Sequence, residues 1–107
     1  MTKIASVIVL RITNKELCES YREKPCVVCG TQNEVCGHHI RTKGSGGDDI
    51  EENLIPLCFQ HHTEIHQIGL TRFCKKYSNA KWFILGMKWF YCDLRKRYFN
   101  DRVYTSN

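Results

Sequence analysis

Long apolar runs are missing from this 107-residue chain. No uninterrupted apolar segment approaches the roughly 18 residues that a membrane span requires. The run over residues 4–10 is apolar but short. Without a longer apolar stretch and a small-residue cleavage site, it does not match a signal peptide. We therefore expect neither a membrane segment nor an export signal, and we interpret residues 3–11 as a β-strand.

An even set of cysteines is also missing. Seven cysteines would leave one thiol over in a fully disulfide-bonded secreted domain. Together with the absence of an export signal, this favours a reducing compartment, where thiolates bind metal instead of pairing with one another. We expect a cytoplasmic, intracellular protein.

Internal repeats and low-complexity tracts are absent as well. A composition of 42% hydrophobic and 25% charged residues is that of a folded chain and not of a disordered one. A chain of this length is expected to form one domain over residues 1–107. We divide it into a core over about residues 24–70 and a basic helical C-terminal extension over residues 71–100.

Acidic residues are scarce in the last third of the chain. Residues 1–70 contain seven Lys/Arg against nine Asp/Glu, whereas residues 71–107 contain nine against two. This asymmetry is the electrostatic feature expected of a nucleic-acid binder, but it also serves solubility in many proteins. Charge by itself leaves both interpretations open.

Metal-ligating side chains are concentrated in one stretch, and all five histidines lie within residues 38–66. Two knuckles, C-x2-C and C-x2-H, offer thiolate and imidazole ligands. We predict that they hold a structural zinc ion, because four protein ligands leave no position for water: Cys26, Cys29, Cys58 and His61. A redox pair is the alternative for the first knuckle, but no thioredoxin-like βαβ pattern surrounds it. Cys36 is a rival zinc ligand.

The remaining histidines predict a second, open metal site. His62 and His66 are four residues apart on a predicted helix and so share one face. With His38 they supply three imidazoles, which leave coordination positions for water and a phosphate oxygen, as in catalytic metal sites. His39 is the extra histidine, and a neutral imidazole can take a proton from water. We expect Asn53 or a backbone carbonyl to orient this base, or to hold the loop that does.

The loop over residues 41–52 is rich in glycine and carries charges that can meet a phosphate. Arg41 and Lys43 are candidate phosphate ligands, and solvated loop charges are an equal alternative. Asp48 and Asp49 could reach a metal, although capping of the loop backbone is favoured.

The other segments predict short elements. We expect a helix after Asn14, strands over residues 35–40 and 53–57, helices over 58–68 and 72–77, and a long last helix from Asn79 to about residue 97. The aromatic residues of the last helix are favoured as core over a base-stacking platform, since a small domain needs the apolar area.

The pattern C-x2-C…HHI…G-x-GG-DD…NL-x-PLC-x2-HH-x3-H, over about residues 24–70, resembles the HNH (His-Asn-His) endonucleases with the ββα-metal fold. It is similar in particular to small phage and prophage members related to recombination-enhancing nucleases. The resemblance implies an α+β fold with a zinc-stabilised, treble-clef-like core. An N-terminal strand and helix and C-terminal helices would flank that core.

Residue by residue, the resemblance implies three roles: metal binding by His38, His62 and His66, general base for His39, and the middle Asn of the family name for Asn53. Many members carry Asp in place of His38, which favours a metal softer than Mg²⁺. The implied activity is hydrolysis of DNA phosphodiester bonds, aided by Mg²⁺, Mn²⁺, Ni²⁺ or Zn²⁺. Because no base-reading element is evident in the sequence, we expect little sequence specificity. The products would carry a 5′ phosphate and a 3′ hydroxyl. An inactive, zinc-stabilised DNA-binding module is the alternative.

Overall fold

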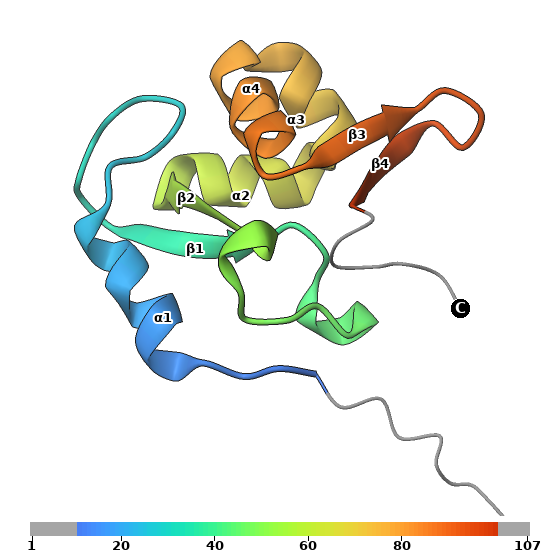
Figure 1. Ribbon diagram of the computed structural model, residues 1–107. Helices are drawn as coiled ribbons and strands as arrows, with labels where there is room; N and C mark the ends of the chain where they lie inside the picture. Colours follow the sequence, from blue (N-terminus) through green and yellow to red (C-terminus); the bar gives the residue numbers. More distant parts are fainter. Residues whose placement is uncertain (1–10, 101–107) are drawn as a thin grey trace, which may run out of the picture.

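The structure is a computed structural model that describes residues 11–100 (Figure 1). Apart from Arg11, the strand predicted over residues 3–11 lies outside the described residues. The chain forms an α+β arrangement of α1 (Lys15–Ser20), β1 (Val35–His39), β2 (Leu54–Cys58), α2 (Phe59–Ile68), α3 (Leu70–Lys76), α4 (Ser78–Gly86), β3 (Trp89–Cys92) and β4 (Arg97–Asn100). Short 3-10 turns occupy Tyr21–Glu23, Lys43–Ser45 and Glu51–Asn53.

The first helix begins where the sequence predicts. The Asn14 side chain accepts a hydrogen bond from the Leu17 N–H at 2.9 Å, which satisfies one of the unpaired amides of the first turn. A 3-10 turn follows and ends at Lys24, whose backbone is extended because Pro25 comes next. Tyr21 is only 2% exposed and packs this segment onto the sheet.

The centre of the molecule is an antiparallel hairpin of β1 and β2, followed directly by α2 (Figure 1). In its register His38 lies opposite Ile55 and His39 lies opposite Leu54. The second strand starts one residue later than predicted, because Asn53 ends a 3-10 turn. Gly69 ends α2 with φ +85°, a conformation that favours glycine, so the helix stops at Ile68 as the sequence predicts.

The helical prediction for residues 71–100 is correct only as far as Gly86. Beyond it the chain forms the β3–β4 hairpin, in which Phe90 faces Phe99 and Tyr91 faces Tyr98. These aromatic residues have high strand propensity and pair across the strands, which outweighs their helix-like spacing. The flanking C-terminal segment is therefore two helices and a hairpin, not helices alone.

The hairpin is anchored to the rest of the molecule at its base. Trp89 is 5% exposed, and its indole N–H donates to the Glu52 carbonyl at 2.6 Å. Asn100 donates from Nδ2 to the Met87 carbonyl at 2.8 Å. One hydrophobic cluster runs from the β1–β2 hairpin through α2, α3 and α4 to Trp89. Within residues 11–100, no helix is both long and apolar enough to cross a membrane.

Candidate metal centres and active site

The two knuckles meet at one place in the fold. The ligand atoms of Cys26, Cys29, Cys58 and His61 all lie within 4.8 Å of one another. The Cys29 and Cys58 sulfurs are 3.9 Å apart, and His61 Nδ1 lies 3.2 Å from the Cys58 sulfur and 3.7 Å from that of Cys26. Ligand atoms around a tetrahedral zinc ion stand about 3.5–3.8 Å apart. The donor set and its spacing therefore fit zinc.

Backbone hydrogen bonds shape the first knuckle. The Gly30 N–H donates to the Cys26 carbonyl at 2.8 Å, with Gly30 at φ +78°. The Val27 N–H donates to the Pro56 carbonyl at 3.0 Å, which ties the knuckle to β2. Burial acts to raise the pKa of Cys26, but backbone N–H groups, first that of Cys58, outweigh it and lower the pKa to about 6. A thiol that ionises this readily is a good metal ligand.

Three imidazoles form a second cluster, one from β1 and two from α2. The ring centroids of His38, His62 and His66 are 4.7–5.0 Å apart, and the Nε2 atoms of His62 and His66 are 3.2 Å apart. Nitrogen ligands of one tetrahedral ion stand about 3.4 Å apart. This spacing fits a shared cation.

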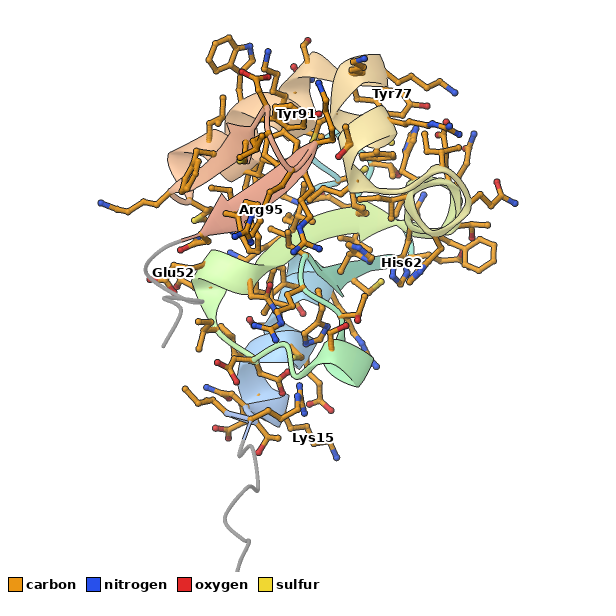
Figure 2. All side chains as sticks on the ribbon, turned by 90° about the vertical axis from the view of Figure 1, so that its right-hand side faces the viewer. Lys15, Glu52, His62, Tyr77, Tyr91 and Arg95 are labelled. Carbon is orange, nitrogen blue, oxygen red and sulfur yellow. The ribbon has the colours of Figure 1, made fainter. Side chains whose placement is uncertain are left out.

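The imidazole cluster is open on one side. His38 is 7% exposed, His62 is half-buried and His66 is exposed. Figure 2 places His62 between Lys15 at one end of the molecule and Tyr77 near the other. Burial, and then the neighbouring His62 and His66, lower the pKa of His38 to about 3. His38 therefore presents a neutral, metal-binding nitrogen at neutral pH.

Cys36 lies beside the imidazole cluster and is not a member of the knuckles. Its sulfur lies 3.2 Å from His62 Nδ1, the ring nitrogen that faces away from His66. The sulfur cluster already has four ligands without it. A sequence signal existed for this contact, since residues 36 and 38 are two apart on β1 and so share a face.

His39 faces a different set of partners from His38. Its Nε2 lies 2.7 Å from Asp49 Oδ1, and the His39 side chain is 11% exposed. Asp49 also pairs with Arg11 and accepts from the Asn14 N–H at 2.8 Å. Burial acts to raise the pKa of Asp49, but the Asn14 and His39 hydrogen bonds and the Arg11 charge lower it to about 2. Because the carboxylate is ionised, His39 donates from Nε2, and Nδ1 is the nitrogen that can accept a proton.

Asp49 is therefore the orienting partner that sequence reasoning missed. Asn53, which was expected to orient His39 or to hold its loop, braces the loop. It is fully buried and accepts from the Arg41 N–H at 2.7 Å. Its Nδ2 donates to the carbonyls of Arg41 and Asp48, both at 3.0 Å. No local pattern shows the His39–Asp49 contact, since the two residues are ten positions apart in the chain.

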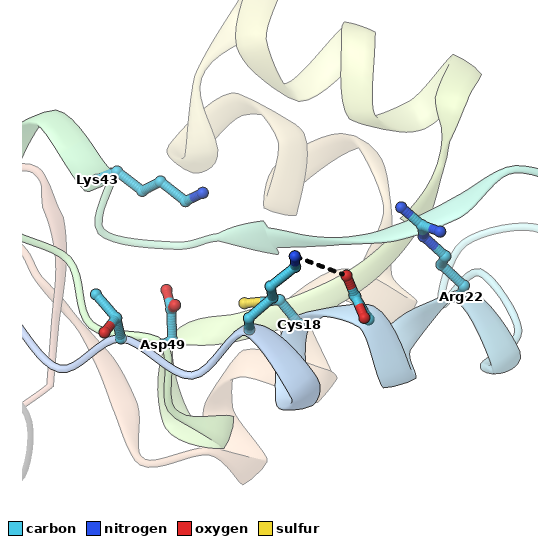
Figure 3. A pocket seen from close by; sticks show the side chains of 7 residues that line it. Cys18, Arg22, Lys43 and Asp49 are labelled. Atoms are coloured by element: carbon cyan, nitrogen blue, oxygen red, sulfur yellow. Dashed lines mark ion pairs between the residues drawn. The ribbon is translucent and has the colours of Figure 1, made fainter.

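The two candidate phosphate ligands point to different places. Lys43 lines a pocket of about 290 Å³ beside Asp49, together with Lys15 and Arg22 (Figure 3). Arg41 donates from Nε to the Ser45 carbonyl at 3.0 Å and lines a separate groove. Lys43 is therefore the one that adjoins the His39–Asp49 pair.

The site thus combines a zinc-type sulfur cluster, three convergent imidazoles and a carboxylate-bound histidine in an α+β fold. A family model described as "Putative HNHc nuclease" matches residues 5–88. The chain belongs to this family, whose membership indicates nuclease activity and a nucleic-acid substrate. Neither a curated protein nor a solved structure matches the chain. The predicted link to phage and recombination proteins remains a prediction.

Proposed function

We propose that this protein is a metal-dependent DNA endonuclease with the ββα-metal fold, in which His39 is the general base. One observation supports this most directly. Three imidazoles with room for further ligands adjoin a fourth histidine, which is held by an ionised carboxylate. The His62 pKa is lowered mainly by burial, then by the charge of His66, and then by that of His39, so His39 lies near His62. Base and metal ligands therefore border one site, as hydrolysis of a phosphodiester requires.

The metal ligands in this proposal are His38, His62 and His66. They would hold a divalent cation such as Mg²⁺, Mn²⁺, Ni²⁺ or Zn²⁺. When bound, the cation supplies charge stabilisation to a phosphate oxygen and to the departing 3′ oxygen. The four knuckle ligands would hold a separate structural zinc ion, because three of the four residues are buried and their three sulfurs and one imidazole nitrogen complete a tetrahedral set.

The chain's own part in the reaction is the handling of a proton. His39 takes a proton from water at Nδ1 while Nε2–H remains bonded to Asp49, which stabilises the imidazolium as it forms. Arg11 and the Asn14 amide keep Asp49 ionised and in place. Lys43 contacts the phosphate beside this pair, and Arg41 is the second candidate contact. The products carry a 5′ phosphate and a 3′ hydroxyl.

The test is His39→Ala, assayed by nicking of supercoiled plasmid with each of the four metals. Removal of a general base lowers the rate by about 10²–10⁴-fold. Zinc content should stay as in the wild type, because His39 belongs to neither cluster. The variant should unfold cooperatively, with a modest loss of stability from the lost hydrogen bond to Asp49. A variant that cuts at nearly the wild-type rate would reject this role for His39.

A DNA-binding module without activity is the second candidate, and the basic C-terminal part favours it. The same assay separates the two functions. Binding to plasmid without nicking in any of the four metals would support the module, since such a module has no need of His39 or the imidazole cluster.

A further inference from the structure

The C-terminal part of the chain presents a strongly basic surface that the proposed chemistry does not use. Residues 71–100 contain eight Lys/Arg against a single carboxylate, Asp93. The eight cationic residues are exposed. A surface of this charge attracts polyanions, and its affinity for them depends on salt.

A groove joins this surface to the catalytic loop. Its volume is about 610 Å³, and it lies between the loop that follows His39 and the β3–β4 hairpin. Arg41 lines it from the loop, and Arg97 lines it from β4. Thr71 and Tyr98 line it where α3 approaches the hairpin. Arg41 is only two residues from His39, so a strand of nucleic acid in this groove runs toward the proposed site.

A second groove continues the first. Its volume is about 550 Å³, and it shares Thr71 and Tyr98 with the first groove. Three cations line it: Lys75 from α3, Lys81 from α4 and Lys96 from the hairpin turn. Hydroxyl groups also line this groove, and Asp93 is the one acidic residue in its lining. Cations and hydroxyls are the side-chain groups that contact phosphates.

The hairpin adds aromatic rings to these cations. The Arg95 and Arg97 guanidinium carbons lie 5.2 and 4.9 Å from the centre of the Phe99 ring. Phe90 and Tyr91 are 43% and 37% exposed. Figure 2 shows Tyr91 and Arg95 in the part of the molecule away from Lys15. Stacked guanidinium groups and exposed rings are common where proteins hold nucleic acid.

We propose that the two grooves bind the nucleic-acid backbone on one side of the bond that is cut. This inference rests on the proposed function, since the polyanion is the substrate. Charge complementarity and continuity with the catalytic loop identify the occupant. The family match ends at residue 88, so the hairpin that lines both grooves lies outside the matched region. The surface therefore sets how this chain holds its substrate, while the core performs the chemistry.

The test measures binding of a fluorescein-labelled DNA duplex by anisotropy over a range of salt concentrations. All proteins carry His39→Ala, so that the DNA is not cut. The groove variant is Lys75→Ala with Lys81→Ala, two exposed helical positions where alanine is well tolerated. The control is Lys24→Ala with Lys76→Ala, which removes the same charge outside both grooves.

The groove variant should bind at least about tenfold more weakly, and its slope of log affinity against log salt should be smaller by about 2. Arg97→Ala should weaken binding in the same direction through the first groove. The control should bind within twofold of the parent protein. Circular dichroism checks that every variant is folded.

The inference is overturned if groove and control variants bind equally, or if the parent binds no DNA. It is also overturned if the groove variant changes the oligomeric state instead of DNA affinity, because the surface would then be an interface between copies. Cleavage by the wild-type chain is measured separately. If the groove variant binds DNA more weakly and the wild-type chain cuts no DNA, the grooves are supported and the nuclease proposal is rejected. If the wild-type chain cuts DNA and the groove variant binds it as the parent does, the nuclease proposal is supported and the grooves are rejected.

Discussion

The sulfur cluster and the imidazole cluster lie on the same ββα segment but differ in burial and charge. In the sulfur cluster Cys26, Cys58 and His61 are 2–8% exposed and only Cys29 is exposed, whereas in the imidazole cluster only His38 is buried. Three thiolates more than neutralise a zinc ion, while three neutral imidazoles leave its charge available to a phosphate. The difference teaches that one cluster suits the stabilisation of the fold and the other suits chemistry.

The largest effect is expected from Cys58→Ala. Cys58 ends β2 and precedes α2, so its loss opens the sulfur cluster where the two elements meet. Structural zinc is worth about 10–16 kcal/mol in zinc-finger peptides, which exceeds the stability of most small domains. We expect loss of bound zinc and of cooperative unfolding, measured by metal analysis and circular dichroism.

Cys92→Ala is the matched control for this change. Cys92 lies on β3, is half-buried and belongs to neither cluster. It should retain zinc and cooperative unfolding. If Cys58→Ala behaved like Cys92→Ala, the structural role of the sulfur cluster would be wrong.

His66→Ala should produce the opposite result, with the fold kept and cleavage lost. The side chain is exposed, so its removal leaves no cavity. Changes to groups that only support a metal ligand cost about 10–100-fold, so loss of a ligand should cost at least about 100-fold. Plasmid nicking at increasing Mn²⁺, together with thermal unfolding, measures this. Unfolding of the variant would show that the two clusters do not divide fold and chemistry.

Asp49→Asn should affect the rate without touching either cluster. The amide no longer stabilises the imidazolium of His39, and we expect the rate to fall by roughly 10–100-fold. The variant should also be less stable by about 1–3 kcal/mol, because Arg11 and the Asn14 amide lose a charged acceptor. Nicking rates and urea unfolding give the two values.

The pH dependence of that stability difference follows from the lowered pKa of Asp49. Its folded pKa of about 2 lies below the ordinary value of 3.8. The stabilisation is therefore present in full above the ordinary value and is lost as pH falls through the folded value. The gap between wild type and Asp49→Asn should stay constant down to about pH 5 and narrow between about pH 4 and 2. A gap that closed already near neutral pH would contradict the Asp49 assignment.

The smallest effect is expected from Cys36→Ala. The Cys36 sulfur lies 3.2 Å from the His62 nitrogen that faces away from His66, so without it the ligand remains but is less firmly held. We expect at most about a tenfold loss of cleavage, reduced by added metal, with zinc content unchanged. If the variant instead lost the knuckle zinc, Cys36 would be a ligand of that zinc ion.

Much of the core could be predicted from the sequence because it depends on residues close together in the chain. The C-x2-C knuckle, the i,i+4 pair His62 and His66, the Asn14 cap and the Gly69 stop are each decided within about one turn of chain. The C-terminal hairpin could not be predicted in this way, because Trp82, Trp89 and their neighbours fit a helical spacing. Cross-strand pairing such as Phe90 with Phe99 decided that segment.

The sequence by itself determined which side chains can bind metal and how they divide into two sets, because knuckle and helix spacings are short-range geometry. Only the tertiary structure decided that Asp49 holds His39, that Cys36 supports His62, and that α3, α4 and a hairpin form basic grooves beside the catalytic loop. The residues brought together in this way are 10 to 59 positions apart in the chain. At such separations the direction of a side chain depends on how whole helices and strands pack, and the periodicity of the local sequence does not predict it.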